Sequence, residues 1–195
     1  AAIVPPFFME HDMDIDRLID EVIGREGGYV DHPADRGGPT RWGVTQQVAR
    51  AYGYAGDMRV LPRSTSAAIY KRRYWSDVRF DDVADRAPDL AGELFDAGIN
   101  MGPERAAGFL QRALNVLNRG AVDYPDIVAD GRIGPMTLHA LDGYIEHRGR
   151  GEGLDVLLFA VRCLRGERYA EIIEANPSQE VFSYGWFARM VRAAA

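Results

Sequence analysis

The chain has 195 residues, with 23 basic and 29 acidic side chains and a formal net charge of −6 at pH 7. Hydrophobic residues make up 47% and charged residues 27%, which are ordinary values for a globular protein and exclude a disordered or fibrous chain. The acidic balance argues against nucleic acid as a partner, because nucleic-acid binders usually carry a basic surplus. No apolar run approaches the roughly 20 residues that cross a bilayer, so we expect no membrane insertion. The length predicts one domain, with room for two lobes.

The first residues and the single cysteine predict little about function. Residues 1–12 lack the basic start and the apolar core of a signal peptide, and Pro5-Pro6 would break a helix there. We therefore treat residues 1–12 as an N-terminal extension. Cys163 is the only cysteine, which excludes an intrachain disulfide and a thiolate metal site. Because Cys163 lies in the apolar stretch 157–164, we expect a buried, inert thiol.

The first predicted element is a helix that begins at Asp12 or Asp14, either of which can cap its N-terminus. Apolar residues then recur at the spacing of one buried helical face. This face consists of Ile15, Leu18, Ile19, Val22 and Ile23. Gly27-Gly28 end the helix, and residues 29–41, which are dense in Pro, Gly and Asp, predict a loop or short hairpin.

Helical patterns occupy most of the remaining chain. Residues 42–45 predict a short extended segment, and Gly102-Pro103 separates two consecutive helices, with Pro103 at the first helical position. The predicted helices cover residues 46–52, 64–75, 89–101, 103–117, 135–147, 154–175 and 182–194. This pattern predicts a mainly α fold with an irregular loop directly after the first helix.

Glu26 is the most informative single residue of the sequence. It follows Val22 and Ile23 at spacings of four and three, so it continues the apolar face of the first helix. Burial and the negative end of the helix dipole both disfavour the carboxylate, and they should raise the pKa of Glu26. A carboxylic acid that is protonated near neutral pH is what general acid catalysis requires. The alternative is a helix-end glutamate that turns to solvent or pairs with Arg25 or Arg41.

A second carboxylate, Asp35, lies nine residues further on in the glycine- and proline-rich loop. Together with Glu26 it forms a pair in two environments, one apolar and one solvated. Glycoside hydrolysis uses such a pair, with an acid for the leaving oxygen and a base or nucleophile on the other side of the sugar. On its own Asp35 could be a turn former, and Asp31 and His32 are nearby alternatives.

Polar residues that could contact a substrate or a water occur near this pair and in a later helix. The hydroxyls of Thr40 and Thr45 could orient a water, although each is also an ordinary turn or strand residue. Asn100 lies in an apolar helix end, so its amide must find polar partners or line a cleft. Asp96 lies four residues earlier on the same face and could support Asn100 or cap a turn.

Aromatic residues could stack on sugar rings or belong to the core. They are Tyr29, Trp42, Tyr70, Tyr74 and Trp75. Most of them are expected in the core, while Tyr29 and Trp42 are the strongest candidates for substrate contact because they flank the predicted acid. Tyr70 is kept as a further candidate for substrate contact.

Several separated motifs occur in the order typical of one known family. They are Glu26-Gly27-Gly28-Tyr29, WGVTQ at 42–46, IYKRRYW at 69–75, FDAGINMGP at 95–103 and DGRIGP at 130–135. Over residues 13–190 the chain resembles glycoside hydrolase family 108, the N-acetylmuramidases of phage-endolysin and bacterial secretion-activator type. Its later motifs resemble the C-terminal segment of that family, a predicted peptidoglycan-binding domain.

The resemblance implies a lysozyme-like, two-lobed helical fold with Glu26 as the catalytic acid. In phage lysozymes an Asp and a Thr follow the catalytic Glu, and the spacing of the Asp matches at Asp35. Thr40 falls near the expected place of the Thr and Thr45 falls beyond it, so the residue that positions the water stays open.

The resemblance also implies domain boundaries and an activity. Residues 13–88 are expected to form a catalytic lobe and residues 89–195 a helical second lobe, packed as one unit. The implied reaction is hydrolysis of the β-1,4 bond between N-acetylmuramic acid and N-acetylglucosamine in peptidoglycan glycan strands, without a metal or cofactor. The alternatives are a lytic transglycosylase, which needs one acid/base and no attacking water, and a non-catalytic cell-wall binding protein. We expect a monomer that acts in the periplasm or cell wall and reaches it by a holin-type or secretion route.

Overall fold

The computed structural model describes residues 15–25, 28–31 and 38–192. Its helices are α1 (Ile15–Arg25), α2 (Gln46–Ala51), α3 (Arg63–Lys71), α4 (Phe80–Ala84), α5 (Pro88–Met101), α6 (Pro103–Leu117), α7 (Pro135–Arg148), α8 (Glu152–Ala175) and α9 (Glu180–Arg192). Short 3-10 turns η1 (Met58–Val60) and η3 (Pro177–Gln179) and the π-helical turn η2 (Arg72–Ser76) complete the helical elements of this part of the chain. The mainly α prediction is confirmed, and each predicted helix is present in the described residues. The predicted start of the first helix at Asp12 or Asp14 and the predicted end of the last helix at residue 194 lie outside the described residues.

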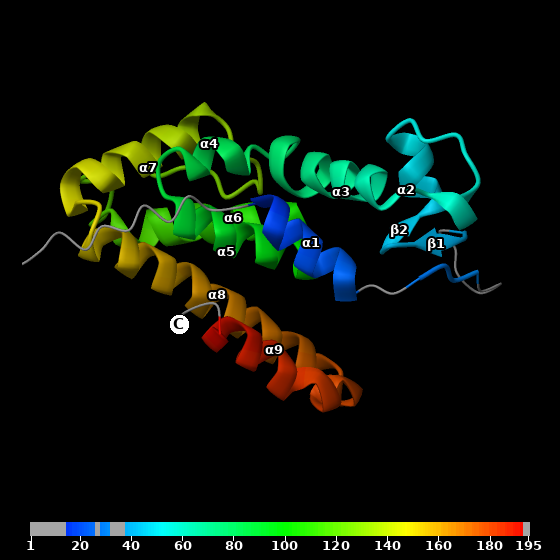
Figure 1. Ribbon diagram of the computed structural model, residues 1–195. Coiled ribbons are helices and arrows are strands. Elements are labelled where there is room, and N and C mark those ends of the chain that lie inside the picture. Colours follow the sequence, from blue (N-terminus) through cyan, green and yellow to red (C-terminus); the bar gives the residue numbers. More distant parts are fainter. Residues whose placement is uncertain (1–14, 26–27, 32–37, 193–195) are drawn as a thin grey trace, which may run out of the picture.

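The helices of the second half pack around a pair formed by α5 and α6. Figure 1 shows this pair in the middle of the molecule, with α7 on one side and α8 and α9 on the other. The long helix α8 contacts α5, α6 and α7, and α9 folds back along it. Pro103 opens α6 at its first position, where a missing N–H costs nothing, and Gly102 at φ 91° makes the corner before it.

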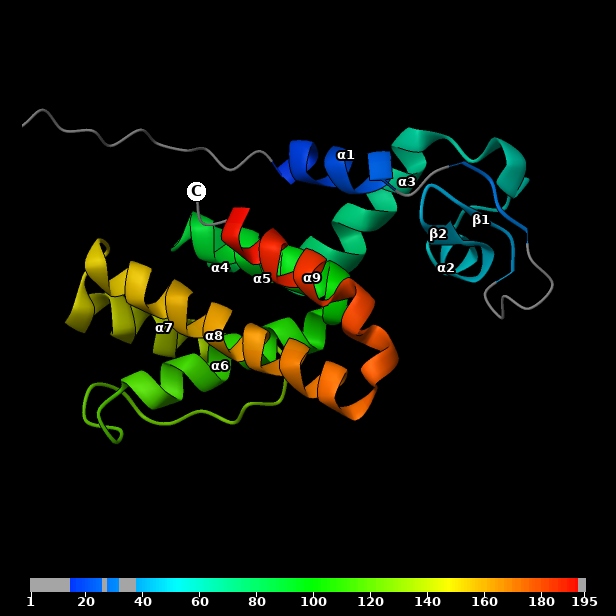
Figure 2. The ribbon, with the colours of Figure 1, turned by 90° about the horizontal axis from the view of Figure 1, so that it is seen from below.

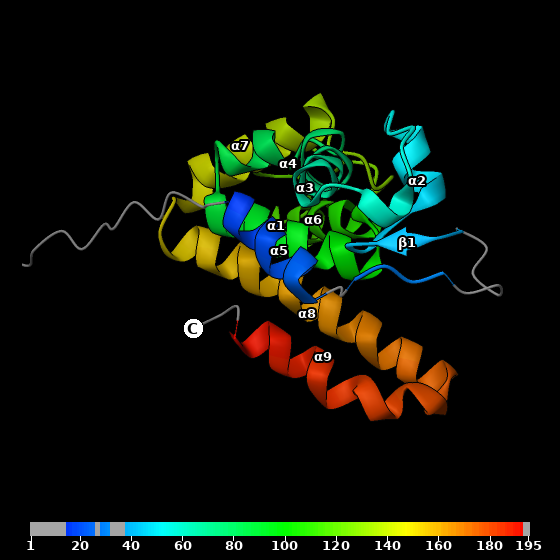
Figure 3. The ribbon, with the colours of Figure 1, turned by 45° about the vertical axis from the view of Figure 1, so that its right-hand side comes forward.

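The helix α1 buries the face that its sequence predicts. Ile19 and Ile23 are buried in the core, and the other apolar residues of the face pack partly buried against it. Two ion pairs join α1 to α3. The Lys71 ammonium at the last residue of α3 is 2.8 Å from an Asp16 oxygen, and the Arg63 guanidinium at its first residue contacts Asp20. The helix α1 packs against α3, and in the view of Figure 3 it lies in front of α5.

A two-stranded hairpin follows α1, formed by β1 (Thr40–Arg41) and β2 (Val44–Thr45). Trp42 and Gly43 form its turn with φ of 53° and 72°, which is the type I′ geometry that matches the twist of paired strands. A bridge between Val30 and Thr40 extends the pairing by one residue. The predicted loop or hairpin is therefore a hairpin in its described part, and Figure 2 shows it at one end of the molecule beside α2.

The expectation of a buried Cys163 is wrong, because this thiol is exposed. The buried positions of α8 recur every four residues and are Gly153, Leu157, Val161, Arg165 and Tyr169. Cys163 lies two residues from Val161 and from Arg165, and two residues turn a helix by about 200°. The thiol therefore lies on the opposite face. No helix of the described ranges has both the length and the apolar content that would let it cross a membrane.

Candidate active site

The predicted acid Glu26 and the predicted base Asp35 lie outside the described residues, as does the alternative His32. The structure does describe the elements that flank them: α1, which ends at Arg25, the segment 28–31, and the hairpin. The described part of the site therefore consists of the predicted neighbours of the carboxylate pair.

Tyr29 lies half-buried between an acidic and a basic partner. Its hydroxyl donates to an Asp31 carboxylate oxygen at 3.1 Å, and the Arg59 guanidinium lies 5.7 Å from the centre of its ring. Desolvation, followed by the hydrogen bond to Asp31, raises the pKa of Tyr29 above its ordinary value. Tyr29 is thus a neutral phenol at physiological pH, and Asp31 already accepts a hydrogen bond from it.

Trp42 is fixed in the turn of the hairpin. Its left-handed backbone is rare for an aromatic residue and is held by contacts to the next segments. The indole nitrogen donates to the Leu61 carbonyl at 3.1 Å, and the Trp42 carbonyl accepts from the Ser66 hydroxyl at 3.2 Å. The Arg41 guanidinium lies 5.3 Å from the ring centre. Trp42 is half-buried, so part of this residue remains accessible.

The two predicted threonines take part in local structure. The backbone of Thr40 exchanges hydrogen bonds of 2.7 and 2.8 Å with Val30, and its hydroxyl donates to the Gly38 carbonyl at 3.4 Å. The Thr45 hydroxyl accepts from the Val48 N–H at 3.3 Å and so caps α2. Thr40 keeps only a long hydrogen bond, which leaves it the better candidate of the two for orienting a water.

Tyr70 lies in the core. Its side chain is 6% exposed, and its ring stacks on Tyr74 with the centres 5.5 Å apart. This placement leaves the ring little surface for a sugar, and it agrees with the core position that the sequence also allowed. Trp75 is likewise buried, with its ring edge-on to Phe95 at 5.9 Å.

Asn100 is exposed at the end of α5, and its amide is engaged on both sides. The amide nitrogen donates to the Asp96 carbonyl at 2.6 Å, and the amide oxygen accepts from the Arg189 guanidinium of α9. Arg189 also lies 3.7 Å from an Asp96 carboxylate oxygen. The helix α9 is a neighbour of Asn100 that the sequence did not indicate.

A buried guanidinium of α8, that of Arg165, contacts the helix α5 near Asn100. Arg165 is fully buried and donates to Glu93 at 2.6 Å and to Asp96 at 2.5 Å, while Arg162 donates to Glu93 at 2.8 Å. Burial would lower the pKa of Arg165, but the charges of Asp96 and Glu93 outweigh it and raise that pKa above its ordinary value. Sequence analysis missed this cluster. Its signal is the charged Arg165 at a position where the four-residue spacing of α8 places core residues.

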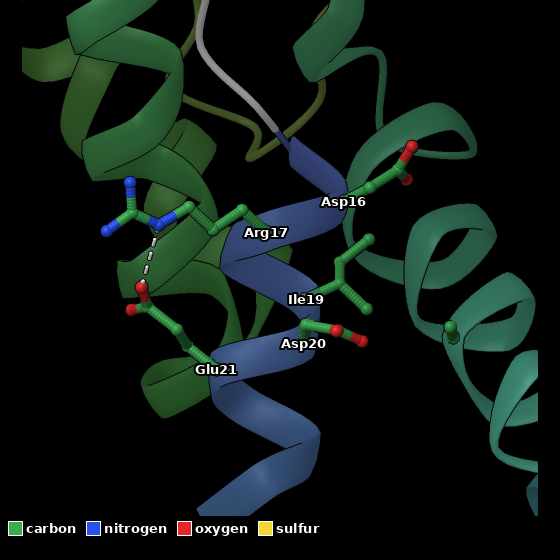
Figure 4. Close-up of a pocket in the computed structure, with 6 residues that line it drawn as sticks. Asp16, Arg17, Ile19, Asp20 and Glu21 are labelled. Carbon is green, nitrogen blue, oxygen red and sulfur yellow. Dashed lines mark hydrogen bonds and ion pairs between the residues drawn. The ribbon is translucent and has the colours of Figure 1, made fainter.

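Two hollows lie on the described surface away from the predicted site residues. One, of about 680 Å³, lies beside α1 and is lined by Asp16, Arg17, Ile19, Asp20, Glu21 and Ala67. Figure 4 shows Asp16, Ile19 and Asp20 directed toward α3, with Arg17 and Glu21 paired on the other side of α1. All three carboxylates of this hollow are in ion pairs, so it lacks an unpaired acid for catalysis.

The second hollow lies between α6, α7 and α8. It has about 480 Å³ and is lined by Leu117, Tyr144, His147, Arg148, Glu152, Gly153 and Val156. Figure 1 shows the junction of α7 and α8 at the opposite end of the molecule from the hairpin. Across residues 15–25, 28–31 and 38–192, His, Cys, Asp and Glu form no group that could hold a metal ion.

The mainly α fold and the order of the motifs are those expected of a lysozyme-like glycoside hydrolase. Residues 19–102 match the family described as Glycosyl hydrolase 108, and residues 105–191 match the one described as Predicted Peptidoglycan domain. These two matches, in this order along the chain, confirm the resemblance that the motifs indicated. The junction of the two matches falls between α5 and α6.

Among solved structures, the chain is similar to SagA of Brucella abortus, with a TM-score of 0.62 and 25% sequence identity. The likeness covers 92% of this chain and 90% of that chain, so it extends through both matched segments. No curated protein matches the chain. Together the two family matches and the fold support a lysozyme-like hydrolase of peptidoglycan.

Proposed function

We propose that the protein is an N-acetylmuramidase, which cleaves the β-1,4 bond between N-acetylmuramic acid and N-acetylglucosamine with Glu26 as its general acid. The observation that carries the proposal is the match to Glycosyl hydrolase 108 over residues 19–102, which includes Glu26. In the sequence Glu26 comes three residues after Ile23, which is fully buried on α1. An acid at the end of such a helix meets the conditions that keep a carboxyl group protonated.

In this mechanism Glu26 gives its proton to the glycosidic oxygen as the bond to the anomeric carbon breaks. Asp35 either activates a water or stabilises the positive charge that develops at the anomeric carbon. The neutral hydroxyl of Tyr29 and the accessible part of Trp42 lie on the described elements that flank the pair, where they can contact the sugar. The proposed site of action is the periplasm or cell wall, where the substrate is.

The proposal is tested with parent and Glu26→Gln protein on purified peptidoglycan. The amide is nearly isosteric with the acid, so we expect an unchanged melting temperature and a rate loss of about 10²–10⁴-fold, the usual contribution of general acid catalysis. Glu21→Gln is the matched control, because Glu21 is an exposed residue of the same helix that pairs with Arg17. Parent-like turnover in a folded Glu26→Gln protein would refute the assignment.

The ends of the released glycans separate the proposal from its alternatives. Mass spectrometry should show muramic acid with a free reducing end, because hydrolysis adds water across the bond. An anhydro-muramic end would instead indicate a lytic transglycosylase. If the parent protein binds peptidoglycan but releases no soluble product, the protein is a cell-wall binding protein.

A further inference from the structure

Three aromatic rings form a near-parallel series between α8 and α9. Trp186 lies against Tyr169 with ring centres 5.1 Å apart and planes at 29°, and Phe182 lies beyond Trp186 at 6.4 Å and 17°. The exposure rises along the series: Tyr169 is 4% exposed, Trp186 is half-buried, and Phe182 is 54% exposed. The outermost ring is therefore an accessible aromatic face with a built support beneath it.

The support is rigid because its inner end belongs to the buried ionic cluster. The Tyr169 hydroxyl accepts from Arg165 at 3.1 Å, and Arg165 is itself held by Glu93 and Asp96. A ring that is fixed before binding loses little conformational entropy when a ligand stacks on it. Phe182 and Trp186 thus form a preorganised surface.

The same stripe of α9 leads to the end of α5. Phe182, Trp186 and Arg189 are spaced i, i+4 and i+7, which places them on one side of the helix. Arg189 donates to Asn100, so the side of α9 that carries the aromatic rings also contacts the end of α5 at Asn100, a predicted substrate contact. Phe182 and Arg189 are separated by about 10 Å along the axis of α9.

The charge around the stripe decides which class of ligand it suits. Residues 174–188 contain two acidic residues and no basic one, and Arg189 of the stripe is engaged by Asn100 and Asp96. Helices that bind anionic membranes instead carry Lys and Arg directed to the lipid beside their aromatic residues. Amide and hydroxyl side chains that can hydrogen-bond to sugar hydroxyls occur near the rings in the sequence: Asn176, Ser178, Gln179 and Ser183. A neutral ligand rich in hydroxyl and amide groups, with flat apolar ring faces, matches this surface.

We propose that Phe182 and Trp186 form a sugar-stacking subsite for the glycan strand of peptidoglycan, continuous with the Asn100 end of α5. This inference rests on the proposed function and on the match of residues 105–191 to a predicted peptidoglycan domain. The C-terminal segment then extends the substrate surface of the hydrolase instead of acting as a separate anchor. A glycan strand that stacks on the rings would continue along α9 toward Asn100.

The matched control is provided by Tyr184 on the same helix. Its ring is 86% exposed, more than that of Phe182, but it lies two residues away and therefore on another face of α9. If any exposed aromatic residue of α9 could bind glycan, Tyr184→Ala and Phe182→Ala would have equal effects. The subsite predicts that only Phe182→Ala does.

The experiment measures kcat and KM on soluble glycan strands freed of their stem peptides. For Phe182→Ala we expect KM to rise about three- to tenfold with kcat little changed, because one stacking contact is lost away from the bond that is cut. Phe182→Tyr should restore the parental KM, since it keeps the ring. Phe182→Leu should not restore the parental KM. Because the Leu side chain keeps much of the apolar packing of α9, this variant distinguishes the loss of the ring from a destabilised helix.

Each outcome has a defined meaning. A parental KM for Phe182→Ala, a full rescue by Phe182→Leu, or an equal loss for Tyr184→Ala would overturn the subsite while leaving hydrolysis intact. A parent protein that releases no glycan ends would instead overturn the proposed function. Binding of the parent to phosphatidylglycerol vesicles, or dimerisation that Phe182→Ala abolishes, would assign the stripe to a membrane or to a second copy and would also overturn the proposal.

Discussion

At the scale of single residues, the fully buried Arg165 joins the C-terminal helices to α5. Its guanidinium contacts Glu93, whose side chain is also fully buried, and no water can solvate either charge there. Removing one partner of such a pair leaves a charge uncompensated in the interior, which costs about 3–5 kcal/mol. Substitutions in this cluster therefore measure how far the stability of one matched segment depends on the other.

We predict that Arg165→Met lowers the free energy of unfolding by about 3–5 kcal/mol, measured by urea denaturation. Arg112→Met is the control, because Arg112 pairs with Glu167 on the surface and such pairs contribute about 1 kcal/mol or less. Adding Glu93→Gln to Arg165→Met should recover part of the loss. An Arg165→Met protein as stable as Arg112→Met would contradict the prediction.

A second residue-scale prediction concerns Asp35. If it is the base or the charge stabiliser, Asp35→Asn should lower kcat far more than it raises KM, with the melting temperature unchanged. If Asp35 only shapes its loop, the melting temperature should fall while the activity of the folded protein survives. That result would move the role to Asp31, Thr40 or Thr45.

Gly131 illustrates a glycine that the backbone requires. Its φ is 75°, and a Cβ at this position would come within 2.6 Å of the Glu104 carbonyl oxygen. Its N–H donates to the buried Gln111, whose amide donates in turn to Asp130, so the turn is fixed on α6. We predict that Gly131→Ala destabilises the protein by more than about 1 kcal/mol in thermal or urea unfolding. Gly134→Ala, where a Cβ meets open space, should cost less.

At the scale of elements, hydrophobic periodicity predicted the long helices well and the short ones poorly. The regular apolar spacing of α1, α6 and α8 appears directly in the sequence, because each helix buries one face. The helix α4 was not predicted, because Phe80–Ala84 is too short to show a period. The hairpin turn was predicted only as extended chain, since the left-handed backbone of Trp42 depends on hydrogen bonds to distant Leu61 and Ser66.

The candidate site was predictable only as far as local pattern decides it. Glu26 could be selected from its helical spacing, and Tyr29 and Trp42 from their places beside it. The partners of Asn100 could not be predicted, because α9 reaches it through contacts between residues 89 positions apart. Tyr70 could not be assigned to core or surface, because one aromatic residue on a helix has the same pattern in either place.

The helix α2 offers a prediction at this scale. The Thr45 hydroxyl caps its N-terminus, so Thr45→Ala should lower the free energy of unfolding by about 1 kcal/mol, while Thr45→Ser should keep the cap. Urea unfolding measures the stability of both variants, and steady-state kinetics on peptidoglycan measure whether either substitution changes KM. If the cap is the whole role of Thr45, both variants should have parental KM. A raised KM in Thr45→Ala that Thr45→Ser restores would show that the hydroxyl also contacts substrate.

At the scale of the whole molecule, the junction between the two family matches is not a boundary between two cores. Buried side chains of α5, including Leu94 and Phe95, belong to the same core cluster as Leu110 of α6 and Val161 of α8. The ionic contacts of Glu93 and Asp96 also cross from the first segment to the second. Neither matched segment can therefore bury its apolar faces alone. All of these contacts lie within residues 89–195, so they support the proposal that α5 belongs to the second lobe.

We predict that a fragment ending at residue 102 is unfolded and inactive, whereas the full chain unfolds in one transition. Without α8, Glu93 would lose both guanidinium partners, and the core side chains Leu94 and Phe95 would face water. Losing the packing of a few such core side chains, at about 2–5 kcal/mol each, is comparable to the whole stability of a typical domain, which is about 5–15 kcal/mol. Circular dichroism and thermal unfolding of the fragment, compared with the full chain, measure the effect. A fragment that melts cooperatively and hydrolyses peptidoglycan would show that residues 19–102 form an independent enzyme.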